Sequence, residues 1–192
     1  MAPKALPSPE VLRQLLRYEP DTGKLFWRER PLSFFSGTAF RGAEHCCANW
    51  NAIFAGKEAF TAFDRHGYAV GRIFDRLYRA HRVAWCLHYG AWPVADIDHI
   101  NQIKPDNRIA NLRDVTNAEN CLNRGLQSNN SSGFAGVYWH KSRSQWAAEI
   151  KIGGKRTKLG YFNDLSEAVA ARKSAEQRLG FHPNHGSAPS QT

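Results

Sequence analysis

The segment DIDHINQIKPDNRIANLRDVTNAENCLNR, residues 96–124, combines an Asp-His pair with an unusual density of asparagine. His99 follows Asp98 directly; Asn111 lies 12 residues after this histidine and Asn120 lies 21 residues after it. Such residues can hydrolyse a phosphodiester, because a histidine with a pKa of about 6.5 can take a proton from water. Carboxylate and amide oxygens are ligands that Mg²⁺ accepts, and the ion would offset charge on the phosphate. The alternative is a polar surface loop without chemistry.

Short elements must position these residues. Residues 96–100 alternate like the end of a strand, and KPDN at 104–107 predicts a turn. Residues 111–115 can return as a second strand. The next four residues, TNAE at 116–119, have the form of a helix capping box, which puts Asn120 in the first turns of a helix. The predicted unit is strand, loop, strand and helix, with the helix start against the first strand.

This pattern resembles the HNH endonucleases in their H-N-N form, as found in homing-type enzymes of phages and introns. The resemblance covers roughly residues 66–126. It implies a ββα-metal core in which His99 is the general base that activates water. It also implies that Asp98 and Asn120 hold one divalent metal ion, Mg²⁺ or a substitute such as Mn²⁺, at the scissile phosphate. Asn111 would pin the loop between the strands and orient the histidine through backbone hydrogen bonds.

Basic residues around this segment are candidates for contacts with DNA. Arg108, Arg113 and Arg124 are candidates to contact phosphate, and each is expected to be a DNA-backbone contact or a solvated arginine rather than a catalytic group. His81 and Arg82 lie before the motif, and we expect them to serve helix packing and phosphate contact rather than proton transfer.

A second segment follows the polar linker QSNNSSG at residues 127–133. The runs GVYWHK, QWAAEIKI and KRTKLGYF predict three strands, each with an apolar and a polar or basic face. EAVAARKSAEQRLG predicts a helix on the apolar face, and strand parity assigns Trp139 and Trp146 to that side as core. The other face is suited to a DNA groove, with cations on phosphates and planar groups on base edges. It carries Tyr138, His140, Lys151, Arg156 and Lys158.

Residues 131–180 resemble the AP2 DNA-binding domain through S-G-F-x-G-V, W-A-A-E-I, L-G-Y-F and E-A-x-x-A-R. The resemblance implies a three-stranded antiparallel sheet plus a helix that binds double-stranded DNA. It also adds Glu149 to the five residues above as a base or phosphate contact. Plant members carry arginines where this chain has Ala135 and Tyr138, and a tryptophan near Lys158. Their sequence specificity therefore does not transfer.

The composition favours a nucleic-acid partner over a small-molecule substrate. Lys and Arg total 26 against 17 Asp and Glu in 192 residues, a net charge of +9, although a basic protein without such a partner is the alternative. The four cysteines form no C-x-x-C pair, so neither structural zinc nor a disulfide framework is expected. No apolar run approaches the ~20 residues that span a bilayer, and the N-terminus lacks a signal sequence. The expected location is cytoplasmic, in a bacterial or phage-infected cell.

The expected fold class is α+β, with a ββα-metal HNH nuclease core followed by a three-stranded antiparallel sheet plus helix. The expected parts are an N-terminal helix and hairpin region (1–55), a nuclease domain (56–127), an AP2-like domain (128–182) and a disordered tail (183–192). Helices are expected at residues 11–20 and 80–90, the latter ended by Gly90, whereas residues 33–55 have no clean period. The expected function is a metal-dependent DNA endonuclease targeted by the AP2-like module. The alternatives are a non-cleaving DNA-binding regulator that uses the HNH fold as a scaffold, and a non-enzymatic packaging protein.

Overall fold

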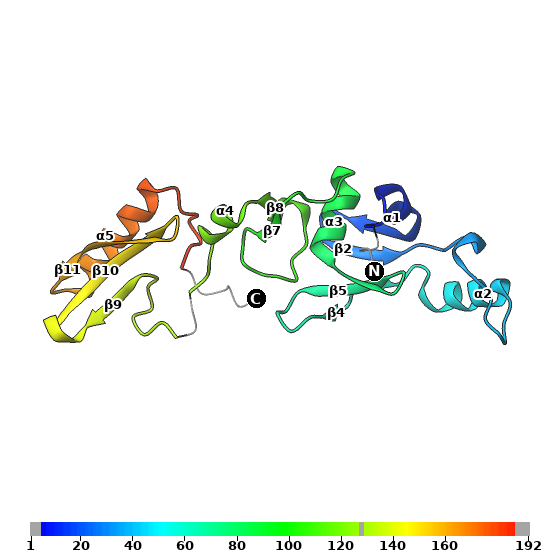
Figure 1. Cartoon of the computed structure of the whole chain (residues 1–192), viewed down its shortest axis with the longest axis horizontal. Helices are drawn as coiled ribbons and strands as arrows, with labels where there is room; N and C mark the ends of the chain where they lie inside the picture. Colours follow the sequence, from blue (N-terminus) through cyan, green and yellow to red (C-terminus); the bar gives the residue numbers. More distant parts are fainter. Residues whose placement is uncertain (1–4, 127–128, 187–192) are drawn as a thin grey trace. The chain divides into compact units, whose positions relative to one another are not determined.

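The computed structural model describes residues 5–126 and 129–186, and its contacts divide the chain into two compact units (Figure 1). The first unit comprises Met1–His99 and Lys104–Asp114, and the second comprises Ile100–Ile103 and Val115–Thr192. Both combine short helices with small sheets, so the expected mixture of α and β elements is confirmed. Within the two described ranges, no helix is long and apolar enough to cross a membrane.

The first unit begins with a helix that is shorter than the sequence predicts. Helix α1 (Pro9–Leu15) starts at its N-cap Ser8, and β1 (Leu16–Glu19) follows without a break. The prediction of one helix over residues 11–20 is therefore wrong for its second half. The reason is tertiary, because β1 pairs antiparallel with β2 (Lys24–Trp27), and this ladder overrides the helical pattern of the leucines. Strand β3 (Glu58–Ala59) completes the sheet, in the order β1-β2-β3.

A second sheet leads into the helix that precedes the motif. Strands β4 (Ala62–Phe63), β5 (Ala69–Ile73) and β6 (Arg76–Arg79) pair in the order β4-β5-β6, and α3 (Ala80–Tyr89) follows directly. Gly90 caps α3 with a left-handed φ of 74°, which confirms the predicted end of this helix. The motif then supplies β7 (Asp96–His99), the 3₁₀ turn η2 (Ile109–Asn111) and β8 (Leu112–Val115), with β7 and β8 paired.

The stretch without a clean period contains helix α2 (Ala43–Phe54), after the 3₁₀ turn η1 (Leu32–Phe34). None of the α2 residues is fully buried, so no apolar stripe marks the helix in the sequence. It docks instead through polar and stacking contacts. The Asn51 amide exchanges two hydrogen bonds with the backbone of Arg30, at 2.9 and 3.0 Å, and the guanidinium of Arg30 lies 3.7 Å from the ring centroid of Trp50.

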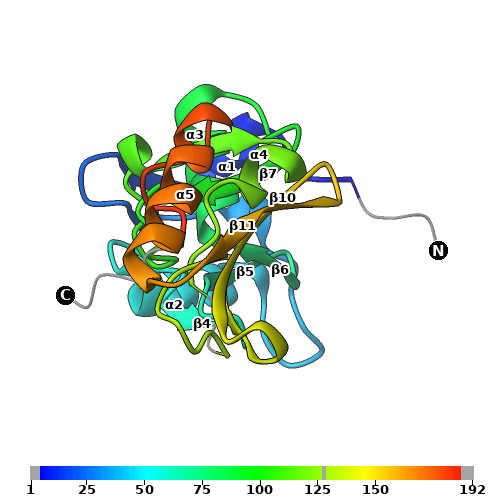
Figure 2. The same cartoon turned by 90° about the vertical axis from the view of Figure 1, so that its left-hand side faces the viewer.

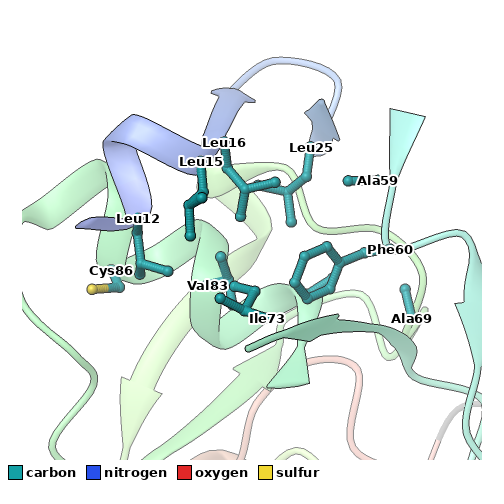
Figure 3. Packing of buried hydrophobic residues seen from close by; sticks show 11 residues of the cluster. Leu12, Leu15, Leu16, Leu25, Ala59, Phe60, Ala69, Ile73, Val83 and Cys86 are labelled. Atoms are coloured by element: carbon teal, nitrogen blue, oxygen red, sulfur yellow. The ribbon is translucent and has the colours of Figure 1, made fainter. Parts of the chain in front are cut away.

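The core of the first unit lies between α1, the β1–β2 hairpin and α3. Figure 3 shows Leu12, Leu16 and Leu25 meeting Val83 and Ile73, all of them buried. Burying such side chains stabilises a fold by about 1.5–3 kcal/mol each. This packing fixes one face of α3, and on another face of its first turn His81 meets the motif histidine described below.

The second unit contains a three-stranded antiparallel sheet with one helix against it. Strands β9 (Val137–His140), β10 (Gln145–Ile152) and β11 (Lys155–Phe162) pair in the order β11-β10-β9. Helix α5 (Leu165–Arg178), capped by Asp164, lies mainly over β10 and β11 (Figure 2). Trp146 packs against the cluster of Val137, Ala148 and Ala168, but Trp139 is 46% exposed. The prediction that Trp139 is core is therefore wrong, because β9 is the edge strand that α5 covers least.

The helix after the motif, α4 (Asn117–Cys121), belongs to the second unit. Its predicted capping box is confirmed, with Glu119 N–H donating to Thr116 Oγ1 and Thr116 N–H donating to Glu119 Oε2. Residues 183–186 of the expected disordered tail are described, and there His185 is buried with its Nε2 3.2 Å from Arg172 Nη2. The rest of that tail, 187–192, and the expected boundary at residues 127 and 128 lie outside the described residues.

Candidate active site

Three of the four motif residues lie around the β7–β8 pair of the first unit. Asp98 and His99 are the last two residues of β7, and both are buried. Asn111 ends η2, immediately before β8, and is also buried. Thus residues separated by 12 positions in the sequence stand at the two ends of one loop. Asn120 lies in α4 of the second unit, where it is partly buried.

Hydrogen bonds close the loop between the two strands. The side-chain amide of Asn111 donates to the backbone carbonyl of Asp106 at 2.8 Å. The backbone carbonyl of the next residue, Asn107, accepts from the hydroxyl of Tyr18 on β1 at 2.7 Å. Asn111 thereby ties the end of the loop to its middle. Tyr18 adds an anchor to the N-terminal sheet that the sequence did not indicate.

The side chain of Asn107 holds the imidazole of His99. Its Oδ1 lies 3.1 Å from His99 Nε2, and both side chains are buried. An amide oxygen only accepts, so Nε2 carries the proton and donates it to this bond. In that tautomer Nδ1 carries no proton. Asn107 is a functional candidate that the spacing of the motif does not predict; its place in the D-N-R triplet after the turn is the signal that the sequence offers.

Two further rings surround His99. The His81 ring centroid lies 5.1 Å away with an edge-on orientation, and that of Tyr68 lies 5.9 Å away. Burial, with a smaller contribution from the neighbouring His99, lowers the pKa of His81 to about 3, so His81 is neutral. Burial also lowers the pKa of His99, although its hydrogen bond to Asn107 opposes the shift. Both histidines are therefore neutral at neutral pH, the form that a general base needs.

The carboxylate of Asp98 is engaged by a guanidinium. Arg113 on β8 donates to Asp98 Oδ2 from Nε at 2.8 Å and from Nη2 at 2.6 Å. A carboxylate oxygen is also a hard ligand of the kind that a divalent ion such as Mg²⁺ prefers. Asn120 offers an amide oxygen of the same kind. No group of three or more His, Cys, Asp or Glu in the described part of the chain could hold a metal ion, and the predicted Asp-Asn pair is not a set of that type.

The other basic candidates have varied surroundings. Arg113, expected to contact phosphate, binds Asp98 instead. Arg82 donates to the backbone carbonyls of Ala95 and Pro93 at 3.0 and 3.3 Å, and so braces the approach to β7. Arg108 forms a fork with Asp106 at 2.8 and 2.6 Å and is largely exposed. Arg124 is exposed in the second unit.

In the second unit, polar side chains converge on the sheet. Glu149 lies opposite Lys158, an opposite-charge pair, whereas Lys151 lies opposite Arg156, a pair of two cations. Glu149 accepts from the Tyr138 hydroxyl at 3.4 Å and from Arg156 Nη1 at 3.2 Å. Five of the predicted contact residues are therefore joined by pairing or hydrogen bonds.

The same surface includes a residue that strand parity missed. The register shifts between Ala148 and Glu149, so Gly160 pairs with the first and Lys158 with the second, leaving one extra residue in β11. The shift reverses the alternation and turns Tyr161 toward the ring of His140, 5.2 Å between centroids. Lys158 donates to the Tyr161 hydroxyl, which lowers the pKa of that phenol. All six predicted residues and Tyr161 thus form one polar surface, called the sheet surface below.

Comparison with known proteins locates the nuclease motif in a family. A family model described as HNH endonuclease matches residues 78–122, a range that contains all four motif residues. HNH nucleases generally use a divalent metal ion. Protein 3.8 of Escherichia phage T7 is 30% identical over 105 residues, which cover 50% of this chain and 83% of that protein. No solved structure matches the chain significantly. The chain therefore belongs to the family of phage T7 Protein 3.8 and carries an HNH endonuclease domain at residues 78–122.

Proposed function

We propose that this protein is a metal-dependent DNA endonuclease in which His99 is the general base of phosphodiester hydrolysis. The observation that carries the proposal is the buried contact between His99 Nε2 and Asn107 Oδ1 at 3.1 Å. It fixes one tautomer of a neutral imidazole, and the neutral ring is the form that can accept a proton. The match of residues 78–122 to the HNH endonuclease family supports the same reaction.

Each residue then has a separate task. His99 accepts a proton at Nδ1 from the attacking water, while Asn107 retains the proton on Nε2. Asn111 holds the loop that carries Asn107, through its bond to the Asp106 carbonyl. Asp98 and Asn120 supply oxygen ligands for one divalent ion, which offsets the charge that builds on the phosphate and the leaving oxygen.

We further propose that the second unit contains an AP2-like module, within residues 128–182, that targets the nuclease to double-stranded DNA. The sheet surface supports this, because lysine and arginine are interleaved there with planar side chains that can reach base edges. Its proposed contacts are Tyr138, His140, Glu149, Lys151, Arg156 and Lys158. Arg108 and Arg124, both exposed, are proposed backbone contacts outside that surface. A phage-infected bacterial cell is the setting in which such an enzyme meets its substrate.

Cleavage of a supercoiled plasmid tests the reaction. Wild-type protein with Mg²⁺ or Mn²⁺ should nick or linearise the plasmid, and a chelator should abolish cleavage while leaving most DNA binding. His99→Ala should lower the rate by about 10²-fold or more, the range of general-base contributions. His88→Ala, which removes an exposed histidine of α3, is the matched control and should keep the wild-type rate.

The results separate the enzyme from a DNA-binding scaffold. If wild-type protein binds DNA but cleaves nothing across metals and salts, the protein is a regulator on an HNH scaffold and the proposed reaction is wrong. If His99→Ala cleaves like wild type, the proposed nuclease activity stands but the assignment of the base does not.

A further inference from the structure

In the first unit, the carboxylate assigned to metal binding already has a cationic partner. Two nitrogens of Arg113 reach the same oxygen of Asp98, at 2.8 and 2.6 Å. The side chain of Arg113 is 31% exposed and that of Asp98 is 10% exposed, so water screens this ion pair less than it screens a surface pair. We propose that Arg113 competes with the divalent ion for Asp98, so that metal binding requires this ion pair to open. The inference rests on the proposed metal-dependent function.

Simple electrostatics makes the two partners exclusive. A divalent ion binds a carboxylate oxygen at about 2.0–2.1 Å, and Oδ2 already accepts two N–H groups. An ion on either oxygen of the carboxylate would stand a few ångströms from the guanidinium. Like charges at such a separation repel strongly in a partly buried site, and a single carboxylate cannot neutralise three positive charges.

The exchange also explains why an arginine stands here. Removing the cationic partner of a buried ion pair is strongly destabilising, because it breaks the pair and leaves the carboxylate buried. Arg113 is that cationic partner for Asp98 and lies on the neighbouring strand, β8. Its partly exposed side chain can leave for solvent, where a guanidinium is well hydrated by comparison with the protein interior. The ion pair therefore stabilises the metal-free protein at the expense of metal affinity.

A second fork in the same loop provides an internal control. Arg108 contacts Asp106 through Nε at 2.8 Å and Nη2 at 2.6 Å, the same two distances as in the Arg113 pair. Its side chain is 55% exposed, however, and Asp106 is not a predicted ligand. Substituting either arginine removes one positive charge and one arginine–carboxylate ion pair. Only the substitution of Arg113 leaves Asp98 without its arginine partner.

Manganese binding to the full-length protein without DNA tests the competition. Free Mn²⁺ is counted by electron paramagnetic resonance during a titration, and thermal unfolding is followed with and without Mn²⁺. Arg113→Met should bind Mn²⁺ about tenfold more tightly than wild type, equivalent to about 1.4 kcal/mol. Without metal, Arg113→Met should have a lower melting temperature than wild type. Added Mn²⁺ should raise the melting temperature of this variant by more than it raises that of wild type. Arg108→Met should change the affinity less than twofold, and adding Asp98→Asn to Arg113→Met should remove the gain.

The outcomes distinguish the inference from the function on which it rests. If Asp98→Asn weakens Mn²⁺ binding but neither Arg113→Met nor Arg113→Gln strengthens it, the competition is refuted and the metal site stands. If Arg108→Met gained as much Mn²⁺ affinity as Arg113→Met, the gain would be an effect of net charge, and the proposed competition would be refuted. If neither the wild type nor the Arg113 variants bind Mn²⁺, the proposed metal-dependent function itself fails.

Discussion

Replacing Asn107 by alanine should impair His99 without touching it. The substitution removes Oδ1, the acceptor 3.1 Å from His99 Nε2, but keeps the backbone carbonyl that binds Tyr18. The imidazole N–H would then be buried without its partner, at a cost of about 1–3 kcal/mol in unfolding free energy. The ring would also lose the bond that selects its tautomer. A loss of about 1.4–2.7 kcal/mol in transition-state stabilisation corresponds to a rate about 10- to 100-fold lower.

Single-turnover plasmid cleavage at saturating metal measures this rate, and urea unfolding measures the stability. Asn117→Ala, on the exposed side of α4, is a matched asparagine control and should keep both. Asn107→Asp retains an acceptor and adds negative charge, so it should recover much of the rate and raise the pKa of His99. As the pH is lowered, cleavage by this variant should therefore decline at a higher pH than cleavage by wild type. A well-folded Asn107→Ala protein with the wild-type rate and pH profile would refute this view of the site.

Three further predictions concern stability and DNA binding. Folding lowers the pKa of His81 from about 6.5 to about 3, so the unfolded chain binds a proton below pH 6.5 that the folded protein does not. The free energy of unfolding should therefore fall by about 1.4 kcal/mol per pH unit below 6.5. Urea unfolding at pH 7 and at pH 5 should show a smaller fall between the two values for His81→Gln than for wild type. Arg156→Ala with Lys158→Ala should reduce the slope of log affinity against log salt by about 1.8, measured by fluorescence anisotropy with duplex DNA. Thr116→Ala should remove the α4 cap and cost about 1 kcal/mol in thermal unfolding.

The sequence predicts elements well where local chemistry decides them. Gly90 ends α3 because a glycine takes the left-handed conformation at little cost, and Thr116 starts α4 through its capping box. The sequence does not predict an element correctly where residues distant in the chain determine its structure. The leucines at the end of α1 continue a helical pattern, but Leu16 pairs with Trp27 in a ladder that only the folded chain provides. Helix α2 escaped prediction because it docks through a few contacts of Trp50 and Asn51 and has no fully buried residue.

On the sheet surface, too, the sequence predicts what local alternation decides and misses what strand pairing decides. Alternation correctly grouped Glu149 with Lys151 and Arg156 with Lys158, since a period of two holds within an unbroken strand. One extra residue in β11 reverses the alternation of side chains between the two faces of the sheet. Tyr161 therefore lies on the sheet surface, which strand parity did not predict. A bulge leaves little mark in a single sequence beyond its glycine, here Gly160.

The asparagines of the motif mark the limit of spacing as a guide to chemistry. Spacing singled out Asn111, whose amide reaches a backbone carbonyl and shapes the loop. The asparagine that contacts His99 is Asn107, which lies eight residues from it across the turn. The order of residues does not show which of the two reaches His99, because both are buried amides in one loop and differ in the direction of their side chains. If the contact of Asn107 with His99 governs the rate, substituting either asparagine should slow cleavage, but only Asn107→Ala should leave the loop intact.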